Sequence, residues 1–269
     1  MPTSPSISDT TRWYDRLWAA FIFFTRLPLW RLHQPPKACY SRVVEHWPLV
    51  GWLTGSFTAT ILWFGCYLLP YPIVVLVAVT ARMLLTGALH EDGLADFVDG
   101  FGAGGSDRER ILDIMKDSRI GTYGVLALLL YVGLLATTLY TLGPYYAALT
   151  MMMADPYAKM LAAQVVMMLP YARTADTAKA RTVYRQMGIR EGILLAVQGL
   201  TPMLAYCWWL RDEVDWQMLV VVPCLAMFVL YRLVAARLRG YTGDCCGALC
   251  LLTELATLLT AAYYLSPDC

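Results

Sequence analysis

Seven long apolar stretches, each long enough to cross a lipid bilayer as a helix, dominate this sequence. A spanning helix needs about 20 mostly apolar residues, and only helices and closed barrels satisfy their backbone hydrogen bonds inside lipid. Charged residues make up 15% of the chain, against about 25% in a soluble domain. We therefore predict an all-α, polytopic membrane helix bundle that forms a single domain over residues 1–269. The predicted spans are 47–69, 72–89, 123–142, 145–169, 193–210, 217–236 and 247–265.

The segment 12–29 precedes these spans and mixes aromatic side chains, such as Trp13 and Trp18, with charged ones, such as Arg16 and Arg26. Interleaved rings and charges are typical of a helix that lies in the membrane interface. We therefore predict an interfacial helix over 12–29, with a re-entrant segment as the alternative.

Basic residues fall almost entirely on one side of the predicted membrane. With seven spans, the N-terminal segment and the loops 90–122, 170–192 and 237–246 lie on one side and carry 17 of the 21 Lys and Arg, while the other side holds Arg211 alone. Because basic loops stay in the cytoplasm, the N-terminus and these loops are predicted to be cytoplasmic, in a multi-pass protein of the inner membrane. A net charge of +1 argues against nucleic-acid binding.

An acidic segment follows the second predicted span and reads His90-Glu91-Asp92-Gly93-Leu94-Ala95-Asp96-Phe97-Val98-Asp99-Gly100. If the helix of that span continues, Asp92, Asp96 and Asp99 share one face, because they are spaced i, i+4, i+7. Three like charges on one face repel one another, and a divalent cation would offset them. Mg²⁺ suits oxygen ligands and takes one or two carboxylates together with waters and substrate phosphates. The segment therefore predicts a Mg²⁺ site, with a solvated helix end as the alternative.

A glycine-rich stretch and a second polar helix come next. The glycines at positions 100, 102, 104 and 105 are predicted to break the acidic helix. Ser106 is the candidate N-cap of the next helix, because Glu109 lies three residues further on. Lys116 and Arg119, near the end of that helix, are suited to phosphate binding. They fit equally well as positive-inside anchors.

Two other predicted cytoplasmic elements could complete a pocket. The loop 170–192 holds Arg173 among several basic residues, and Gly240-Tyr241-Thr242-Gly243-Asp244 stands before the last span. Asp244 can either reach a metal or cap its helix, and the sequence favours neither. The three histidines share no metal-ligand spacing, so zinc is not expected. His90 is a candidate acid or base, with a hydrogen-bonded structural histidine as the default.

Three of these segments together resemble the cobalamin synthase (adenosylcobinamide-GDP ribazoletransferase) family. The resemblance is carried by HEDGLADFVDG at 90–100, ILDIMKDSRIGTYG at 111–124 and GYTGDCCGA at 240–248. Shorter matches are Thr25-Arg26-Leu27-Pro28, Trp47-Pro48-Leu49-Val50-Gly51 and Tyr171-Ala172-Arg173. The similarity runs in the same order from about residue 17 to residue 260.

The resemblance implies a Mg²⁺-dependent membrane transferase that joins adenosylcobinamide-GDP to α-ribazole, or to its 5′-phosphate, and releases GMP. Its implied partners are those two substrates and the lipid bilayer, and it is compatible with a homo-oligomer or a complex with other corrinoid-assembly enzymes. The implied catalytic residues are Asp92, Asp96 and His90. The implied metal ligands are Asp92, Asp96, Asp99, Asp117 and Asp244, and the implied phosphate-binding residues are Lys116, Arg119 and Arg173.

Three other functions stay open on the residues alone. A phosphotransferase of the CDP-alcohol type also uses helix-borne aspartates with a divalent metal, and a membrane prenyltransferase uses Asp-rich motifs that bind Mg²⁺-diphosphate. An ion or corrinoid transporter would place ionisable groups near the membrane midplane, whereas here the polar motifs gather at one face. Asp155 and Lys159, at i and i+4 in the fourth predicted span, are an exception that we interpret as a buried ion pair.

Overall fold

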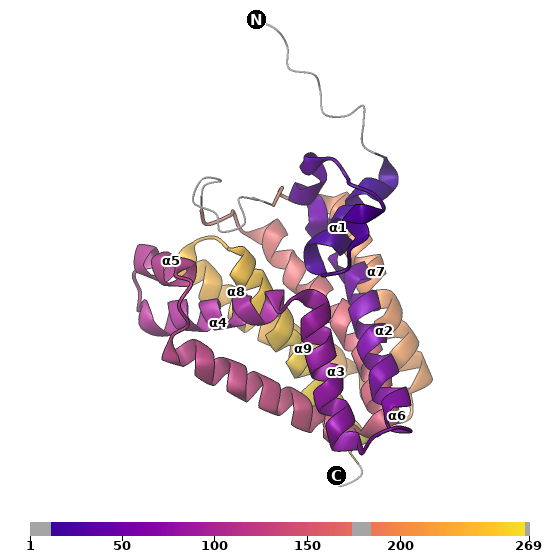
Figure 1. Cartoon of the computed structure of the whole chain (residues 1–269). Helices are drawn as coiled ribbons and strands as arrows, with labels where there is room; N and C mark the ends of the chain where they lie inside the picture. Colours follow the sequence, from indigo (N-terminus) through magenta and orange to yellow (C-terminus); the bar gives the residue numbers. More distant parts are fainter. Residues whose placement is uncertain (1–11, 174–183, 267–269) are drawn as a thin grey trace, which may run out of the picture.

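Helices make up the secondary structure of residues 12–173 and 184–266, which are the part of the chain that the computed structural model describes. No strand forms within these residues, and their only extended pairing is an isolated parallel bridge between Tyr171 and Tyr241. The predicted all-α class is confirmed (Figure 1). The elements are α1 (Trp13–Phe24), η2 (Leu29–Arg31), η3 (Lys37–His46), α2 (Trp47–Gly65), α3 (Tyr71–Thr86), α4 (Leu89–Ala103), α5 (Arg108–Lys116), α6 (Thr122–Met168), α7 (Ile189–Trp209), α8 (Trp216–Leu238) and α9 (Gly243–Leu265).

The longest helix, α6, contains a break that divides it into two segments. Gly143 has φ 69° and ψ 171°, which no helical residue adopts. Pro144 follows, and its ring removes a backbone N–H from the helical hydrogen-bond ladder. The segments 122–142 and 144–168 therefore correspond to the third and fourth predicted spans, and the break lies where the sequence predicts the turn between them.

Within the described residues, four helices are long and apolar enough to cross a membrane: α6, α7, α8 and α9. The bent pair formed by α3 and α4 adds a fifth if it is counted as one span. Every predicted span coincides with a helix or with one half of α6, and the molecule is a multi-pass membrane bundle. The count of seven spans is not confirmed. The helix α2 is not among those that are long and apolar enough to cross a membrane, and α3 qualifies only together with α4.

The sequence predicted that the acidic segment continues the preceding helix. In the structure this segment instead forms a separate helix, α4. The two helices meet at 89°, because Gly87 and Ala88 both adopt left-handed backbone conformations with φ 67° and 55°. Glycine tolerates that conformation and alanine is strained in it. The spacing argument for the aspartates still holds within α4, although its axis lies across the direction of α3.

The ends of α4 and α5 also differ from the prediction. The helix α4 runs through Gly100 and Gly102 to Ala103, and the chain turns only at Gly104 and Gly105. The cap of α5 is Asp107 and not Ser106, because the Asp107 carboxylate accepts hydrogen bonds from the backbone N–H of Glu109 at 3.0 Å and of Arg110 at 3.4 Å. An ionised carboxylate is a strong cap at the positive end of a helix.

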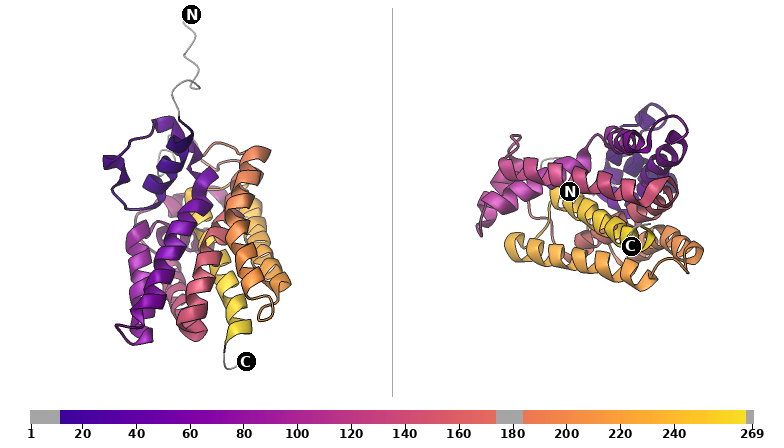
Figure 2. Two further views of the ribbon diagram at one scale, coloured as in Figure 1. Left: turned by 90° about the vertical axis from the view of Figure 1, so that its right-hand side faces the viewer. Right: turned by 90° about the horizontal axis from the view of Figure 1, so that it is seen from below.

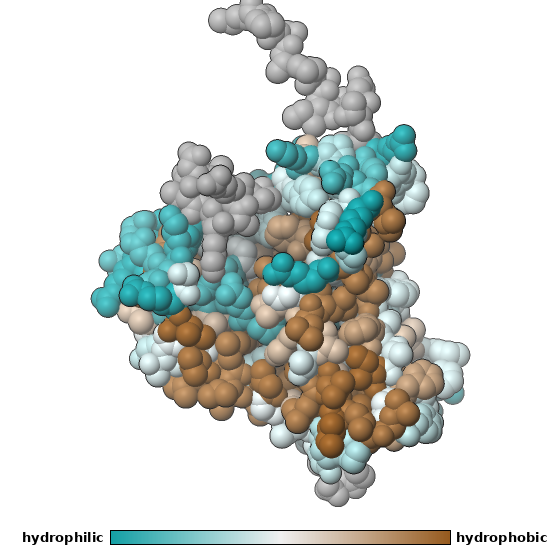
Figure 3. Space-filling view, in the orientation of Figure 1, coloured by the Kyte–Doolittle hydropathy of each residue, from teal (hydrophilic) through white to brown (hydrophobic). Residues whose placement is uncertain are grey.

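The surface separates a polar end from an apolar body. Hydrophilic residues gather over α5 and around the segment from α1 to η3, while the rest of the visible face is mostly hydrophobic (Figure 3). The N-terminal segment lies at one end of the bundle and the end of α9 lies at the other (Figure 2). Large apolar side chains such as Leu129 on α6 and Phe228 on α8 are exposed, as expected of helix faces in contact with lipid.

The helix α9 lies at the centre of the bundle and packs against α4, α6 and α8. A cluster of charged side chains is buried around it. Arg82 of α3 donates a hydrogen bond to Glu254 of α9 at 2.6 Å, and Lys159 pairs with Asp155 within α6. The predicted Asp155–Lys159 ion pair is therefore confirmed, and it belongs to a network in which each buried charge has an opposite partner nearby.

Candidate functional site

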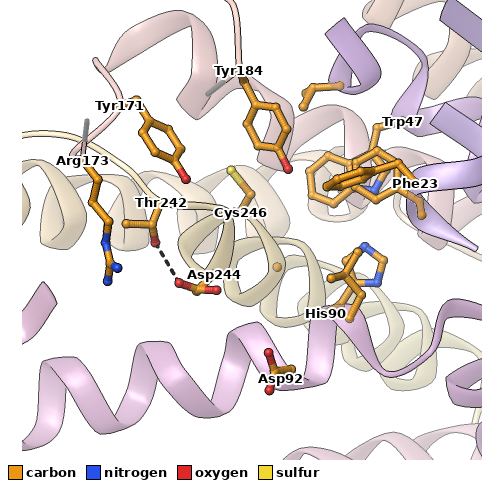
Figure 4. Close-up of a pocket in the computed structure, with 15 residues that line it drawn as sticks. Phe23, Trp47, His90, Asp92, Tyr171, Arg173, Tyr184, Thr242, Asp244 and Cys246 are labelled. Atoms are coloured by element: carbon orange, nitrogen blue, oxygen red, sulfur yellow. Dashed lines mark hydrogen bonds between the residues drawn. The ribbon is translucent and has the colours of Figure 1, made fainter. Parts of the chain in front are cut away.

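A cavity of about 290 Å³ opens where six elements meet at the polar end of the bundle. Its wall has an acidic side from the first turns of α4 and α9, and an aromatic side from α1 and the start of α2 (Figure 4). The lining residues are Phe23, Phe24, Val44, Trp47, Leu89, His90, Asp92, Tyr171, Arg173, Tyr184, Thr242, Gly243, Asp244, Cys246 and Gly247. Four predicted site residues are among them.

Two glycines allow α4 and α9 to approach closely and so bring Asp92 and Asp244 to one cavity. A Cβ atom at Gly93 would lie 3.1 Å from the backbone of Asp244, and one at Gly247 would lie 3.2 Å from the carbonyl oxygen of His90. Larger residues at either position would push the helices apart. Asp92 is exposed and Asp244 is half-buried, so solvent and ligands can reach both carboxylates.

Asp244 lies in the first turn of α9, close to the residue that caps this helix. Thr242 is the N-cap, and its hydroxyl accepts a hydrogen bond from the backbone N–H of Cys245 at 3.3 Å. Asp244 also lines the cavity, and its carboxylate accepts a hydrogen bond from the Thr242 hydroxyl at 3.4 Å (Figure 4). The position of Asp244 is therefore compatible with a ligand-binding role.

Arg173 reaches the cavity because the chain after α6 pairs with the chain before α9. Tyr241 donates its N–H to Pro170 at 3.0 Å, and Ala172 donates to Tyr241 at 2.8 Å. This pairing requires a glycine at position 240, where a Cβ atom would lie 2.8 Å from the Pro170 oxygen. Arg173 donates from one terminal nitrogen to the Leu112 carbonyl at 2.6 Å.

The Nε atom of Arg173 is buried and has no hydrogen-bond partner among the described residues. Buried polar atoms are almost always satisfied, so this guanidinium has capacity left for a ligand. An anionic ligand is the natural partner of a guanidinium that lines a cavity. Of the three predicted phosphate-binding residues, Arg173 is the one that the structure places at the cavity.

The aromatic side of the cavity contains three rings with nearly parallel planes. The ring centroids of Phe24 and Trp47 are 5.2 Å apart, and those of Trp47 and His90 are 5.6 Å apart, with interplanar angles of 12° and 13°. The His90 ring is therefore packed against other rings, and its buried Nε2 has no partner among the described residues. Its acid or base role stays a prediction.

Two tyrosines face the aromatic side from the loops, and their hydroxyl ends point into the cavity (Figure 4). Burial raises the pKa of Tyr171 to about 12, and the nearby Asp244 carboxylate adds to the increase. Burial also raises the pKa of Tyr184. Both phenols therefore stay protonated at neutral pH and act as hydrogen-bond donors.

Asp99 does not line the cavity, which differs from its predicted metal role. Its carboxylate accepts hydrogen bonds from the backbone N–H of Gly121 at 2.7 Å and of Gly124 at 2.9 Å. These groups belong to the first turn of α6, whose unpaired N–H groups need acceptors. Asp99 is thus a cap of α6, and the two glycines let it approach. Asp96, one turn away on α4, is buried and does not line the cavity either.

Lys116, Asp117 and Arg119 are also not brought to the cavity. The helix α5 ends at Lys116, and Asp117 leaves it with extended backbone angles. The Asp117 carboxylate instead accepts hydrogen bonds from Arg119, the shortest at 2.7 Å. These bonds lower the pKa of Asp117 to about 2. The Arg119 side chain is 87% exposed, and neither residue of this pair lines the cavity.

The residues present fit a magnesium ion that shares its coordination with substrate. Among the described residues, no group of three His, Cys, Asp or Glu side chains could hold a metal ion alone. Mg²⁺ does not need such a group, because it commonly binds through one or two carboxylates, several waters and substrate phosphates. Asp92 and Asp244 supply two carboxylates at one cavity, which meets that requirement.

No pattern in the sequence predicted that Phe23, Phe24 and Tyr184 would line the site. Phenylalanine is also expected in an interfacial helix, so the residue type alone does not indicate a site. Phe23 and Phe24 reach the cavity because α1 packs against η3 and α2. The one signal for the phenylalanines was their position in the sequence. They directly precede Thr25-Arg26-Leu27-Pro28, which, like Trp47-Pro48, belongs to the segments that resemble a known family.

Similarity to known proteins extends over nearly the whole chain. The family model described as cobalamin-5-phosphate synthase matches residues 16–262. The chain is 36% identical to the adenosylcobinamide-GDP ribazoletransferase of Leptothrix cholodnii, over 89% of this chain and 92% of that protein. It is 34% identical to the enzyme of the same name from Ralstonia pickettii, over 91% and 94%, and 32% identical to that from Leptospira interrogans, over 90% and 92%. No solved structure matches it.

Proposed function

Because this chain belongs to the cobalamin-5-phosphate synthase family, we propose that it catalyses the ribazoletransferase reaction with Mg²⁺. It joins adenosylcobinamide-GDP to α-ribazole, or to its 5′-phosphate, and releases GMP. In this reaction a hydroxyl of the ribazole attacks the cobinamide-side phosphorus of the diphosphate, and the bond from that phosphorus to the GMP oxygen breaks. The observation that carries the proposal is the meeting of Asp92, Asp244 and Arg173 at one cavity.

The reaction concentrates negative charge on phosphate oxygens, and its catalysis rests on positioning and electrostatic stabilisation. Arg173 would contact the diphosphate through its unsatisfied guanidinium nitrogen. The positive ends of α4 and α9 lie at the same cavity and favour bound anions. Asp92 and Asp244 would hold the metal, which neutralises charge on the diphosphate and the departing GMP when bound.

The attacking hydroxyl must lose a proton. The His90 ring is buried and packed against Trp47 and Phe24, whereas the Asp92 and Asp244 side chains are more exposed at the cavity. A general base must come within hydrogen-bond reach of the proton that it removes. We therefore assign the proton to one of the two carboxylates rather than to His90.

The same proposal places the cavity on the cytoplasmic face of the inner membrane. The cavity lies at the polar end of the bundle, and the segments at that end carry most of the Lys and Arg in the chain. Both nucleotide-derived substrates would therefore reach the enzyme from the cytoplasm.

The test is a reconstituted reaction with the full chain in detergent, supplied with adenosylcobinamide-GDP, α-ribazole and Mg²⁺. Release of GMP coupled to a completed corrinoid is expected, and a chelator should abolish it until Mg²⁺ is restored. Asp92→Asn and Asp244→Asn should each lower the rate at least ~100-fold, comparable to losing one electrostatic contact to a transition state.

Asp212→Asn is a suitable control, because that carboxylate is 88% exposed and pairs only with Arg211 among the described residues. It should keep the wild-type rate. Near-normal rates in both Asp92→Asn and Asp244→Asn would refute the metal assignment, whereas absence of GMP release from the wild-type protein would refute the reaction itself.

A further inference from the structure

The cavity has two chemically different sides, and the proposed reaction uses only the acidic one. The opposite side is built from Phe23, Phe24, Val44, Trp47 and Leu89. Phe24 and Trp47 are 4% and 1% exposed, so both rings are held rigidly by the surrounding core. None of these five side chains is charged, and the more accessible of them are Phe23, which is half-buried, and Leu89, which is 39% exposed.

We propose that this aromatic side binds the flat heteroaromatic base of the nucleoside substrate, α-ribazole. The inference rests on the proposed function, because it names the place of one substrate of that reaction. Stacking of a base on aromatic side chains is a strong interaction that needs no hydrogen bonds. The parallel planes of Phe24, Trp47 and His90 allow an added ring to stack in an offset arrangement.

The chemistry of the wall distinguishes this base from guanine, the other base in the reaction. Guanine carries several donors and acceptors along its edges, and each loses free energy if it is buried without a partner. A benzimidazole is mostly apolar and has one ring-nitrogen acceptor when it is attached to a sugar. The side chains of Phe23, Phe24 and Leu89 offer no hydrogen bonds. Among the described residues of the wall, Trp47 and His90 each have one buried ring nitrogen without a partner, which is too few for the edges of guanine, so the wall suits the benzimidazole.

Size supports the same assignment. Ligand pockets commonly have volumes of about 300–1,000 Å³, and this cavity, at about 290 Å³, lies at the small end. It matches a single nucleoside, whereas a corrinoid with its attached nucleotide is several times larger. The corrinoid would therefore remain mostly outside and present only its diphosphate to the cavity.

The arrangement also orients the nucleoside for reaction. His90 lies in the aromatic wall, and Asp92 and Asp244 line the same cavity. A base stacked on the wall therefore places its sugar on the side of Asp92 and Asp244, where the hydroxyl must lose its proton. Tyr184, whose ring lies 6.3 Å from that of Phe23, closes the cavity over the base.

The test compares Phe24→Leu with Phe24→Tyr, which keeps the ring. Phe24→Leu should raise both the dissociation constant and the KM for α-ribazole about 10-fold and leave the KM for the corrinoid within about 2-fold. Phe24→Tyr should bind α-ribazole nearly as well as the wild type. Binding is measured by equilibrium dialysis of α-ribazole against the full chain in detergent, without the corrinoid.

Phe101→Leu is a matched control, because Phe101 is buried in an aromatic pair with Phe97 and does not line the cavity. It should leave α-ribazole binding unchanged. If Phe24→Leu does not fold, Phe23→Leu replaces it, since Phe23 is only half-buried and lines the same wall.

Unchanged α-ribazole affinity in the leucine variants, or a defect confined to the corrinoid, would overturn the inference and leave the reaction standing. Failure of the wild-type protein to release GMP would instead count against the proposed function. Binding of α-ribazole by a wild-type protein that lacks activity would support the wall while refuting the reaction.

Discussion

Asp92 and Asp99 lie on the same helix but have different surroundings, one at the cavity and one at the start of α6. Replacing each with asparagine should therefore have different effects. Asp99 is buried and accepts two backbone N–H groups from the start of α6, at 2.7 and 2.9 Å. Asp92 lines the cavity and is exposed. We expect Asp99→Asn to lower stability and Asp92→Asn to lower activity.

The size of the stability effect follows from the hydrogen bonds. An asparagine at position 99 keeps one carbonyl acceptor and turns its amide N–H₂ toward the second backbone donor. One hydrogen bond to a charged group is lost, at about 1.5–3 kcal/mol, and the favourable charge at the helix start is lost, at about 0.3–1 kcal/mol. We therefore expect Asp99→Asn to destabilise the protein by about 2–4 kcal/mol.

The assay is thermal unfolding in detergent, followed by tryptophan fluorescence, together with the initial rate measured well below both transitions. Asp99→Asn should lower the Tm by roughly 5–10 °C and retain most of its activity, while Asp92→Asn should keep the Tm and lose the rate. Gly124→Ala is a second probe, because its added Cβ would overlap the Asp99 carboxylate. It should destabilise the protein in the same way without removing the charge.

The opposite outcome would refute this reasoning. If Asp99→Asn unfolds with the wild-type Tm and loses activity as severely as Asp92→Asn, its carboxylate serves the metal, as the sequence pattern alone predicted. The capping role of Asp99 would then be incidental to its function.

Three further measurements test other parts of the molecule. Arg82→Met should cost about 3–5 kcal/mol by stranding the buried Glu254 carboxylate, and Arg82→Met with Glu254→Leu should restore most of the lost Tm; equal losses in both variants would contradict the pairing. Burial, with a smaller contribution from the charge of Arg16, lowers the pKa of His46 to about 4 from 6.5, so its stability contribution is complete above pH 6.5 and lost as the pH falls toward 4. The protein should lose up to about 3 kcal/mol of stability over this range. His46→Asn should therefore make the decrease in Tm between pH 7 and pH 5 smaller. A cysteine at position 106, which is exposed, should react with an impermeant thiol reagent only from the cytoplasmic side, and labelling from the other side would reverse the proposed orientation.

The helical architecture was largely predictable from the sequence, because apolar length and punctuation are local properties. The residues Gly143 and Pro144 marked the break in α6, and the apolar runs marked the helices around it. The bend between α3 and α4 was missed. Gly87 was visible as a helix terminator, but nothing local shows that Ala88 would share its left-handed conformation.

The sequence predicted which residue types form the site, but not which of these residues lie together in the fold. Spacing placed Asp92, Asp96 and Asp99 on one helix, but the partner of each carboxylate is set by other elements. Asp99 meets the start of α6, while Asp92 meets the start of α9. Such long-range pairings depend on helix crossings, and the glycines that permit them, Gly93 and Gly247, resemble ordinary helix glycines in the sequence.

The bend at Gly87 and Ala88 explains why the acidic motif can work at the membrane surface. A non-glycine residue in the left-handed region costs about 1–2 kcal/mol, and such strain persists where the surrounding structure requires it. Here the turn of 89° starts α4 afresh, so that Asp92 falls in its first turn, as Asp244 falls in the first turn of α9. A straight continuation of α3 would have placed Asp92 in a helix interior, without unpaired N–H groups or a positive helix end beside it. Two helix starts meeting at one cavity can instead hold two carboxylates and a bound diphosphate close together, since the helix ends offset the negative charge that both bring.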